Sequence, residues 1–137
     1  MKQITKITLF IMMISALAIF CGCAPSSYSY SVVSSDVYLA GDYMRGPAPR
    51  AIDIELTLSN KTAKDGTEVY FDYFGTRYHG TVKSNRIQWD STPVIIGEGT
   101  ITKSTIEPYN SGIKIIHTYK MNNYSLTGEI IQVFSPK

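Results

Sequence analysis

The chain has 137 residues, with thirteen basic side chains, eleven acidic side chains and a hydrophobic fraction of 44%. Lys2 and Lys6 precede residue 23, so the 115 residues from Cys23 onward carry eleven positive and eleven negative side chains. Because counterion release on DNA or RNA requires an excess of Lys and Arg, this formal neutrality argues against nucleic acid as a partner. A length of 115 residues fits one domain, and ten tyrosines and five phenylalanines indicate a folded core and not a disordered tail.

The N-terminal segment has the pattern of a secretory signal. A short basic region, Met1–Lys6, precedes an uncharged and largely apolar run of fourteen residues, Ile7–Phe20. As a helix that run would cover about 21 Å, which is less than the roughly 30 Å hydrocarbon thickness of a bilayer. The sequence therefore predicts a signal peptide over residues 1–22 and not a transmembrane helix.

The apolar run ends in Phe20-Cys21-Gly22-Cys23-Ala24, which resembles the lipobox of bacterial lipoproteins. In that motif a small residue precedes the cysteine that receives the lipid, so Gly22 marks Cys23 as the expected lipidation site. Phe20 stands where Leu is usual, and Cys21 where Ala or Ser is usual. An alternative frame makes Cys21 the acceptor, directly after bulky Phe20. A disulfide or metal site at the two cysteines is a further alternative, although two thiolates are too few for structural zinc.

The lipobox resemblance implies acyl chains on Cys23 that anchor the mature chain to a membrane without spanning it. One acyl chain binds a bilayer only marginally, whereas several chains hold a protein effectively permanently. Ala24 follows Cys23, and in a Gram-negative host the absence of Asp at that position implies delivery to the outer membrane. We therefore expect a lipid-anchored protein of the cell envelope.

The rest of the chain divides into a short tether and one β domain. Residues 23–31 comprise the expected lipidated cysteine and a small, polar segment, and the domain is expected over 32–137. Ile52, Ile54, Leu56 and Leu58 alternate with polar residues, as in a strand with one buried face. Turn signals divide the remainder into strands expected at 36–45, 51–59, 67–74, 76–83, 86–91, 94–106, 112–121 and 124–134. This pattern predicts an all-β domain, either a small antiparallel meander barrel or a sandwich of about eight strands.

A two-residue turn at Ser84-Asn85 fixes the register of one expected hairpin. It pairs Val82 with Ile87, and Gly80 with Trp89, on an apolar face. On the polar face it places His79 opposite Asp90.

A two-residue turn at Asn122-Asn123 fixes a second hairpin in the same way. Its apolar face would pair Tyr119 with Leu126, His117 with Gly128, and Ile115 with Ile130. Between the two hairpins, the buried positions change from odd to even numbers at Gly75, which predicts a bulge or tight bend that curves the sheet.

Several short motifs resemble those of small calycin-like barrels of the lipocalin and avidin type. They are the opening Leu39-Ala40-Gly41-Asp42-Tyr43, in which Tyr43 replaces the usual Trp, and the Gly-Thr strand openings at 80–81 and 99–100. The resemblance concerns the fold and implies a closed meander barrel.

The pattern of polar residues does not indicate an enzyme. The chain lacks a Gly-x-Ser-x-Gly elbow, an H-E-x-x-H motif and EF-hand spacing, and its carboxylates are scattered over different expected strands. We therefore expect no catalytic residue, no metal and no cofactor. His79 with Asp90 could orient an imidazole for proton transfer or form an ordinary solvated ion pair.

Two functions remain open at this point. The first is a non-enzymatic envelope lipoprotein whose Tyr-rich domain binds an envelope or secreted protein, in an assembly, secretion or blocking role. The alternative is a calycin-like barrel that binds an apolar small ligand lined by Trp89, His117 and Tyr119. His117 could equally be a core histidine hydrogen-bonded to a Tyr hydroxyl or a backbone carbonyl.

Overall fold

The computed structural model describes residues 27–44, 52–90 and 93–137. Cys21, Cys23 and the whole of the predicted signal peptide, residues 1–22, lie outside these ranges. Within the described residues the chain forms ten strands and no helix. The strands are β1 (Tyr28–Leu39), β2 (Asp42–Met44), β3 (Ile54–Leu58), β4 (Glu68–Tyr73), β5 (Thr76–Lys83), β6 (Arg86–Trp89), β7 (Ile95–Ile96), β8 (Gly99–Tyr109), β9 (Gly112–Met121) and β10 (Thr127–Pro136).

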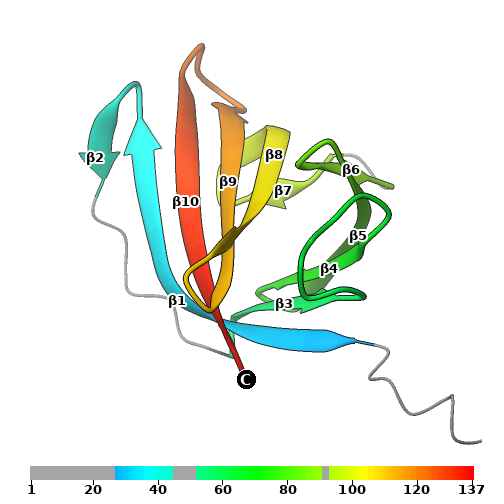
Figure 1. Cartoon of the computed structure of the whole chain (residues 1–137). Helices are drawn as coiled ribbons and strands as arrows, with labels where there is room; N and C mark the ends of the chain where they lie inside the picture. The colour runs from blue at the N-terminus through cyan, green and yellow to red at the C-terminus, as the bar shows by residue number, and fades with distance from the viewer. Residues whose placement is uncertain (1–26, 45–51, 91–92) are drawn as a thin grey trace, which may run out of the picture.

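Eight of these strands close into an antiparallel barrel, which confirms the predicted fold class and selects the barrel over the sandwich (Figure 1). The order around the barrel is β1-β3-β4-β5-β6-β8-β9-β10, and β10 pairs again with β1. The short strands β2 and β7 pair antiparallel with the end of β1 and the start of β8, respectively. Closure pairs the sheet edges that an open sheet would leave free.

The long first strand makes this closure possible because it pairs with two neighbours. Its first residues pair with β3, and its later residues pair with β10. The register with β10 shifts between Val32 and Ser34, and Figure 1 shows β1 bending around the base of the barrel. A bulge of this kind bends a strand and increases its twist. It exposes Val33 and leaves Tyr30 and Val32 buried in the core.

The barrel core follows the predicted two-residue period. Leu56, Phe71 and Ile115 on three strands are fully buried, whereas their chain neighbours face outward and are more exposed. The other fully buried apolar side chains are Leu58, Val69, Val82, Val94, Ile106, Ile113 and Phe134.

Several predicted boundaries differ from the structure, and three of the differences change the organisation of the strands. The tether expected to reach Ser31 is shorter, because β1 already begins at Tyr28 and directs Tyr30 into the core. The strand expected over 36–45 is interrupted at Ala40 and Gly41, whose φ angles of 49° and 87° reverse the chain into β2. The strand expected over 94–106 is likewise divided into β7 and β8 by a turn that contains Gly97 (φ 59°).

The hairpin of β5 and β6 has the predicted register, with Val82 opposite Ile87 and Gly80 opposite Trp89. Ser84 and Asn85 both have positive φ, as a two-residue primed turn requires. The bend predicted at Gly75 is a second such turn, formed with Phe74 between β4 and β5.

The register predicted for the hairpin of β9 and β10 is wrong by two residues. The structure pairs Tyr119 with Gly128, His117 with Ile130, and Ile115 with Gln132. The turn is longer than two residues because the Met121 N–H donates to the Leu126 carbonyl, while the Asn122 N–H donates to the carbonyl of Glu98. A shift of two residues preserves the face of every side chain, so the predicted apolar face survives.

The alternating strands define two ends of the barrel. The start of β1, the connections at 59–67, 84–85 and 110–111, and the C-terminal Lys137 lie at one end, which we call the tethered end. The connections at 40–41, 74–75 and 122–126, with residue 90 and residues 93–98, lie at the other, which we call the open end. In Figure 1 the tip of β1 and the β9–β10 turn are at the top, and the C-terminus is at the bottom.

One position around the barrel is weakly paired. Among the described residues, the ladder between β6 and β8 consists of one pair, Arg86 with Thr105. The Ile106 N–H donates to the Asn85 carbonyl beside it. We call this position the seam; inside the barrel, the indole N–H of Trp89 on β6 donates to Ser104 Oγ on β8 across it.

Candidate binding site at the open end of the barrel

A pocket of about 310 Å³ lies at the open end of the barrel. Its lining is mostly apolar, and Glu98 is the one charged residue among the described residues that line it. Its main side chains come from six strands: Val37 and Leu39 of β1, Met44 of β2, Tyr73 of β4, Ile96 of β7, Tyr119 and Met121 of β9, and Ile130 of β10. The arrangement can hold an uncharged, apolar group.

Tyr119 forms one wall of the pocket because glycines on both neighbouring strands make room for its ring. A Cβ on Gly99 would lie 2.6 Å from Tyr119 Cδ2, and a Cβ on Gly128 would lie 2.5 Å from Tyr119 Cζ. The Tyr119 hydroxyl donates to the Tyr38 carbonyl at 3.0 Å. Burial raises the pKa of Tyr119 and keeps the hydroxyl protonated as that donor.

Exposed apolar side chains are concentrated at the end of the barrel that holds the pocket. Phe74 is 60% exposed and Tyr124 is 63% exposed, and both lie in connections at the open end. The same end presents further exposed large apolar residues in its connections and adjoining strands: Tyr43, Met44, Ile52, Ile95 and Leu126. Single exposed apolar residues are common, but a concentration of them beside an apolar pocket is typical of a binding surface.

A chain of polar side chains crosses the barrel interior. Trp89 Nε1 donates to Ser104 Oγ at 3.1 Å, and Ser104 Oγ donates to His117 Nδ1 at 2.8 Å. His117 Nε2 then donates to Gln132 Oε1 at 3.2 Å, and Gln132 Nε2 donates to Ser35 Oγ at 3.3 Å. Each group is thus paired, which is the condition for burying polar atoms in a core.

The imidazole of His117 is neutral within this chain. Burial lowers the pKa of His117 from 6.5 to about 4, and the hydrogen bond with Gln132 opposes that decrease only in part. Ser104 and His117 resemble a nucleophile with its base, but Ser104 is 1% exposed and its hydroxyl accepts the Trp89 hydrogen bond. The pair therefore belongs to the core and does not face the open-end pocket.

The structure separates the three residues predicted to line a ligand cavity. Tyr119 lines the pocket, whereas Trp89 and His117 lie deeper in the polar chain. Met121 could have been found from the sequence, because it follows Tyr119 at the two-residue period. Met44 could not, because its position depends on the reversal at Ala40 and Gly41.

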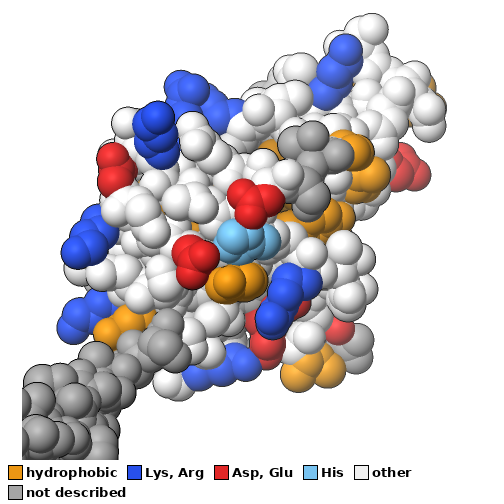
Figure 2. Space-filling model, turned by 90° about the vertical axis from the view of Figure 1, so that its right-hand side faces the viewer, with side chains coloured by type: hydrophobic (Ala, Val, Ile, Leu, Met, Phe, Trp, Pro, Cys, Tyr) orange, Lys and Arg blue, Asp and Glu red, His pale blue; other side chains and the backbone are white. Residues whose placement is uncertain are grey.

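His79 and Asp90 lie side by side on the outer face, with Nδ1 of His79 in contact with the Asp90 carboxylate. The structure adds two residues to this pair. The Glu68 carboxylate lies 3.7 Å from His79 Nε2, and the ring of Tyr70 lies 4.6 Å from the imidazole between centroids. Figure 2 shows a histidine between two acidic side chains on this face. The group forms a surface ion-pair cluster over β4, β5 and β6.

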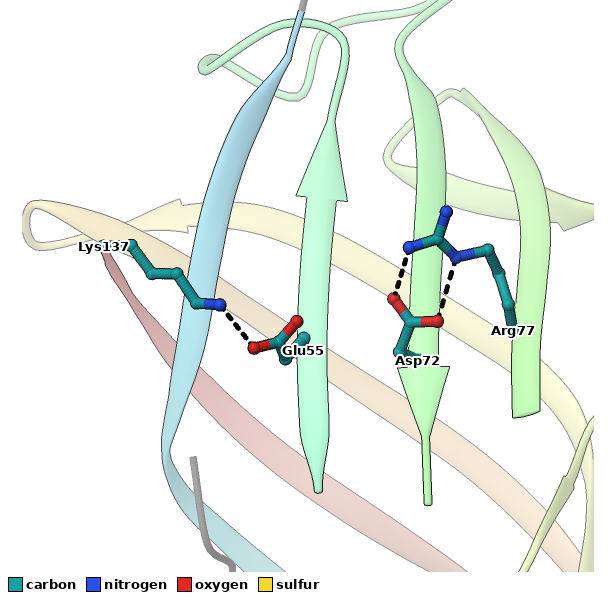
Figure 3. A network of polar contacts seen from close by, with 4 residues as sticks. All are labelled: Glu55, Asp72, Arg77 and Lys137. Atoms are coloured by element: carbon teal, nitrogen blue, oxygen red, sulfur yellow. Dashed lines mark hydrogen bonds and ion pairs between the residues drawn. The ribbon is translucent and has the colours of Figure 1, made fainter. Parts of the chain in front are cut away.

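A second polar network lies on the same side of the barrel (Figure 3). Arg77 and Asp72 form a bidentate pair, with two N–O distances of 2.9 Å, and Arg77 also lies over the Tyr70 ring. The Lys137 ammonium contacts Glu55 on β3. The first pair links β4 to β5, and the second links β3 to the C-terminus.

A groove of about 570 Å³ runs along the seam on the outer surface. Lys83, Arg86 and Lys103 line it, together with Gln88 and small polar residues, and its lining contains no acidic side chain. The groove can attract an anion, but it is open to solvent and provides no enclosed site.

Other site types are not found in the described part of the chain. No group of three or more His, Cys, Asp or Glu side chains there is arranged to hold a metal ion. None of these residues belongs to a helix that could span a bilayer. Comparisons with protein-family models, with curated proteins and with solved structures find no match for the chain.

Proposed function

We propose that the protein is a non-enzymatic envelope lipoprotein, anchored through acyl chains on Cys23, whose barrel binds another protein through its open end. One observation carries the binding part of this proposal. The open end presents exposed apolar side chains around an apolar pocket, and that end lies opposite the start of β1.

The size of the pocket favours a protein over a small molecule. Small-molecule sites typically enclose about 300–1,000 Å³, so a pocket of about 310 Å³ is at the lower limit of that class. Protein interfaces instead place one or two large apolar anchors in such pockets and surround them with further contacts. Phe74, Ile95 and Tyr124 are suited to supply those surrounding contacts.

The position of the anchor supports the same assignment. Three residues separate Cys23 from Ser27, the first described residue, and Ser27 adjoins the tethered end. An anchor at Cys23 would hold that end near the membrane and leave the open end accessible to a partner.

Partner binding is tested by capture from envelope extracts with matched variants. Phe74→Ser and Tyr124→Ser remove exposed apolar side chains at the open end, while Tyr109→Ser removes one at the tethered end. We expect the wild type and the Tyr109 variant to retain the same stoichiometric partner and the other two to lose it at least tenfold. Equal capture by all four proteins would contradict binding through the open end.

Anchoring is tested by labelling with radioactive palmitate. Only a thiol can accept the diacylglyceryl group, so label should enter the wild type and not the Cys23→Ser variant. Label that persists in Cys23→Ser and disappears in Cys21→Ser would move the anchor by two residues. Label that depends on neither cysteine would overturn the lipoprotein assignment.

The pocket itself favours a second candidate, the binding of an apolar small ligand in a calycin-like manner. Met121→Trp should fill the pocket without altering the exposed residues around it, because Met121 lies in its wall. A neutral fluorescent naphthylamine should then bind the wild type saturably at one site and fail to bind the variant. The absence of saturable binding to the wild type would remove this candidate.

A further inference from the structure

We propose that the tethered end of the barrel is a docking surface for anionic phospholipid, which holds the barrel upright on the membrane with its open end outward. This inference rests on the proposed anchor at Cys23. It adds an orientation and a lipid class that the anchor alone does not specify.

Basic side chains are concentrated at this end. Lys61 and Lys64 lie in the loop between β3 and β4, Lys83 and Arg86 flank the turn between β5 and β6, and Lys137 ends the chain. All five are exposed. Within the described residues the first four make no ion pair, and the C-terminal lysine contacts Glu55.

Acidic side chains at the tethered end are fewer and partly engaged. Asp65 accepts a hydrogen bond from the Ser84 N–H at 2.8 Å, and Glu107 pairs with Lys114 at 3.3 Å. Glu68, at the start of β4, lies 3.7 Å from His79. The four cations without ion pairs therefore outnumber Asp65 and Glu68, the two of these carboxylates that pair with no lysine or arginine.

The open end carries the opposite charge among the described residues. Its connections and short strands contain acidic residues: Asp42, Asp53, Asp90 and Glu98. Lys120 is a cation close to it on β9, and Arg77 on β5 is paired with Asp72. The described charges are thus separated along the barrel axis, and an anionic surface would attract one end and repel the other.

A concave site at the tethered end fits a phospholipid headgroup. A groove of about 410 Å³ lies beside the first residues of β1, and Lys61 and Lys137 line it together with Ser27, Ser29 and Ser111. Hydroxyl and ammonium donors in this arrangement suit a phosphate oxygen.

The length of the tether keeps these residues close to the bilayer. The four residue-to-residue steps from Cys23 to Ser27 span at most ~14 Å when extended. The surface potential of an anionic leaflet decays over a Debye length of about 8 Å at physiological salt, so the tethered end can enter that field. Each Lys or Arg near such a surface contributes roughly fivefold to the partition between docked and undocked states.

The test uses the full lipidated protein reconstituted in vesicles of phosphatidylcholine, with and without 30% phosphatidylglycerol. The rate at which a water-soluble acylating reagent modifies individual lysines is measured by mass spectrometry. In anionic vesicles we expect several-fold protection of Lys83 and Lys137, with Lys120 near the open end unprotected, and we expect 0.5 M NaCl to remove the protection. Equal rates in both vesicles, or equal protection of all three lysines, would overturn the proposal.

A pair of charge-matched variants identifies the responsible surface. Lys61→Gln removes one cation from the tethered end, and Lys120→Gln removes one near the open end. The first variant should lower the ratio of docked to undocked protein roughly fivefold, which is the contribution of one cation. The second should retain the protection of Lys83 and Lys137. The reverse result would contradict docking through this end.

Failure of the anchor and failure of the docking surface give different results. The intact mass of the purified protein first establishes whether Cys23 carries acyl chains. If it does not, the proposed anchor is wrong, and the signal-processed chain is added to the outside of the same vesicles. The basic surface should still cause salt-sensitive cosedimentation with anionic vesicles, and its absence there would overturn docking independently.

Discussion

His117 is fully buried in the polar chain of the barrel and lies between two neutral partners. Its Nδ1 is hydrogen-bonded to Ser104, and its Nε2 is hydrogen-bonded to Gln132. Protonation of the imidazole would place a charge where no carboxylate accepts it. Because the folded state lowers the pKa of His117, the unfolded state binds this proton more readily.

The protein should therefore lose stability as the pH falls from about 6.5 to about 4. The contribution of His117 is fully present above pH 6.5, and a pKa change from 6.5 to about 4 corresponds to about 3 kcal/mol lost at the lower limit. Urea unfolding at a series of pH values measures this slope. His117→Gln should unfold with a flatter pH dependence, and an unchanged slope in the variant would contradict the assignment.

Gly128 illustrates a steric requirement at one residue. A Cβ there would lie 2.2 Å from the Tyr38 carbonyl oxygen and 2.5 Å from the Tyr119 hydroxyl oxygen. Gly128→Ala should cost about 3 kcal/mol of unfolding free energy, because the backbone oxygen cannot move without disturbing β1. Tyr119→Phe removes one hydrogen bond and should cost only about 1 kcal/mol. Denaturant titration measures both, and a Gly128 variant as stable as the wild type would refute the clash.

The sequence predicts single residues well where one rule decides their position. Trp89 lies opposite Gly80 because a two-residue turn and a period of two fix that register. The polar chain was not predicted, because the sequence pattern does not reveal that Ser104, His117 and Gln132 meet inside the barrel from three strands. The pocket was partly missed for the same reason, since six strands contribute to it.

At the level of strands, turn length limits what can be predicted. The Asn122-Asn123 pair suggested a two-residue turn, but tertiary contacts decide otherwise: the Asn122 N–H bonds to the Glu98 carbonyl, and the Thr100 hydroxyl donates to Asn122. Both partners lie more than twenty residues away along the chain. Local propensity therefore predicted the existence and the faces of β9 and β10 correctly, and their register incorrectly.

The seam between β6 and β8 should be the first part of the barrel to open. Its ladder contains one described pair, whereas β8 and β9 pair along almost their whole length. Hydrogen exchange should therefore be faster at the amides of residues 87–89 than at those of residues 113–119.

Ser104 links Trp89 to His117 across this seam, so Ser104→Ala should accelerate exchange in β6 at least tenfold. Ser35→Ala is the matched control, because Ser35 ends the same polar chain between the fully paired strands β1 and β10. That variant should leave exchange in β6 unchanged. Equal acceleration by both variants would indicate general destabilisation and contradict a specific role at the seam.

The whole molecule combines two surfaces of different chemistry on one barrel. The tethered end is basic and the open end is apolar with acidic residues around it. Because antiparallel strands alternate in direction, residues far apart in sequence, such as Lys61 and Lys137, meet at one end. Composition gave only formal neutrality, and this separation of charge along the axis required the topology.

The two chain ends of the barrel are neighbours: the Lys137 N–H donates to the Ser29 carbonyl at 3.0 Å, next to the start of β1. A reporter fused after Lys137 would therefore emerge beside the proposed acyl anchor, where a bilayer would limit the access of antibodies and large fluorophores. An epitope inserted between Asn123 and Tyr124, in the exposed β9–β10 turn, would instead be displayed at the far end of the barrel. A label in that turn leaves the proposed anchor unobstructed, although it alters the proposed binding surface beside Tyr124.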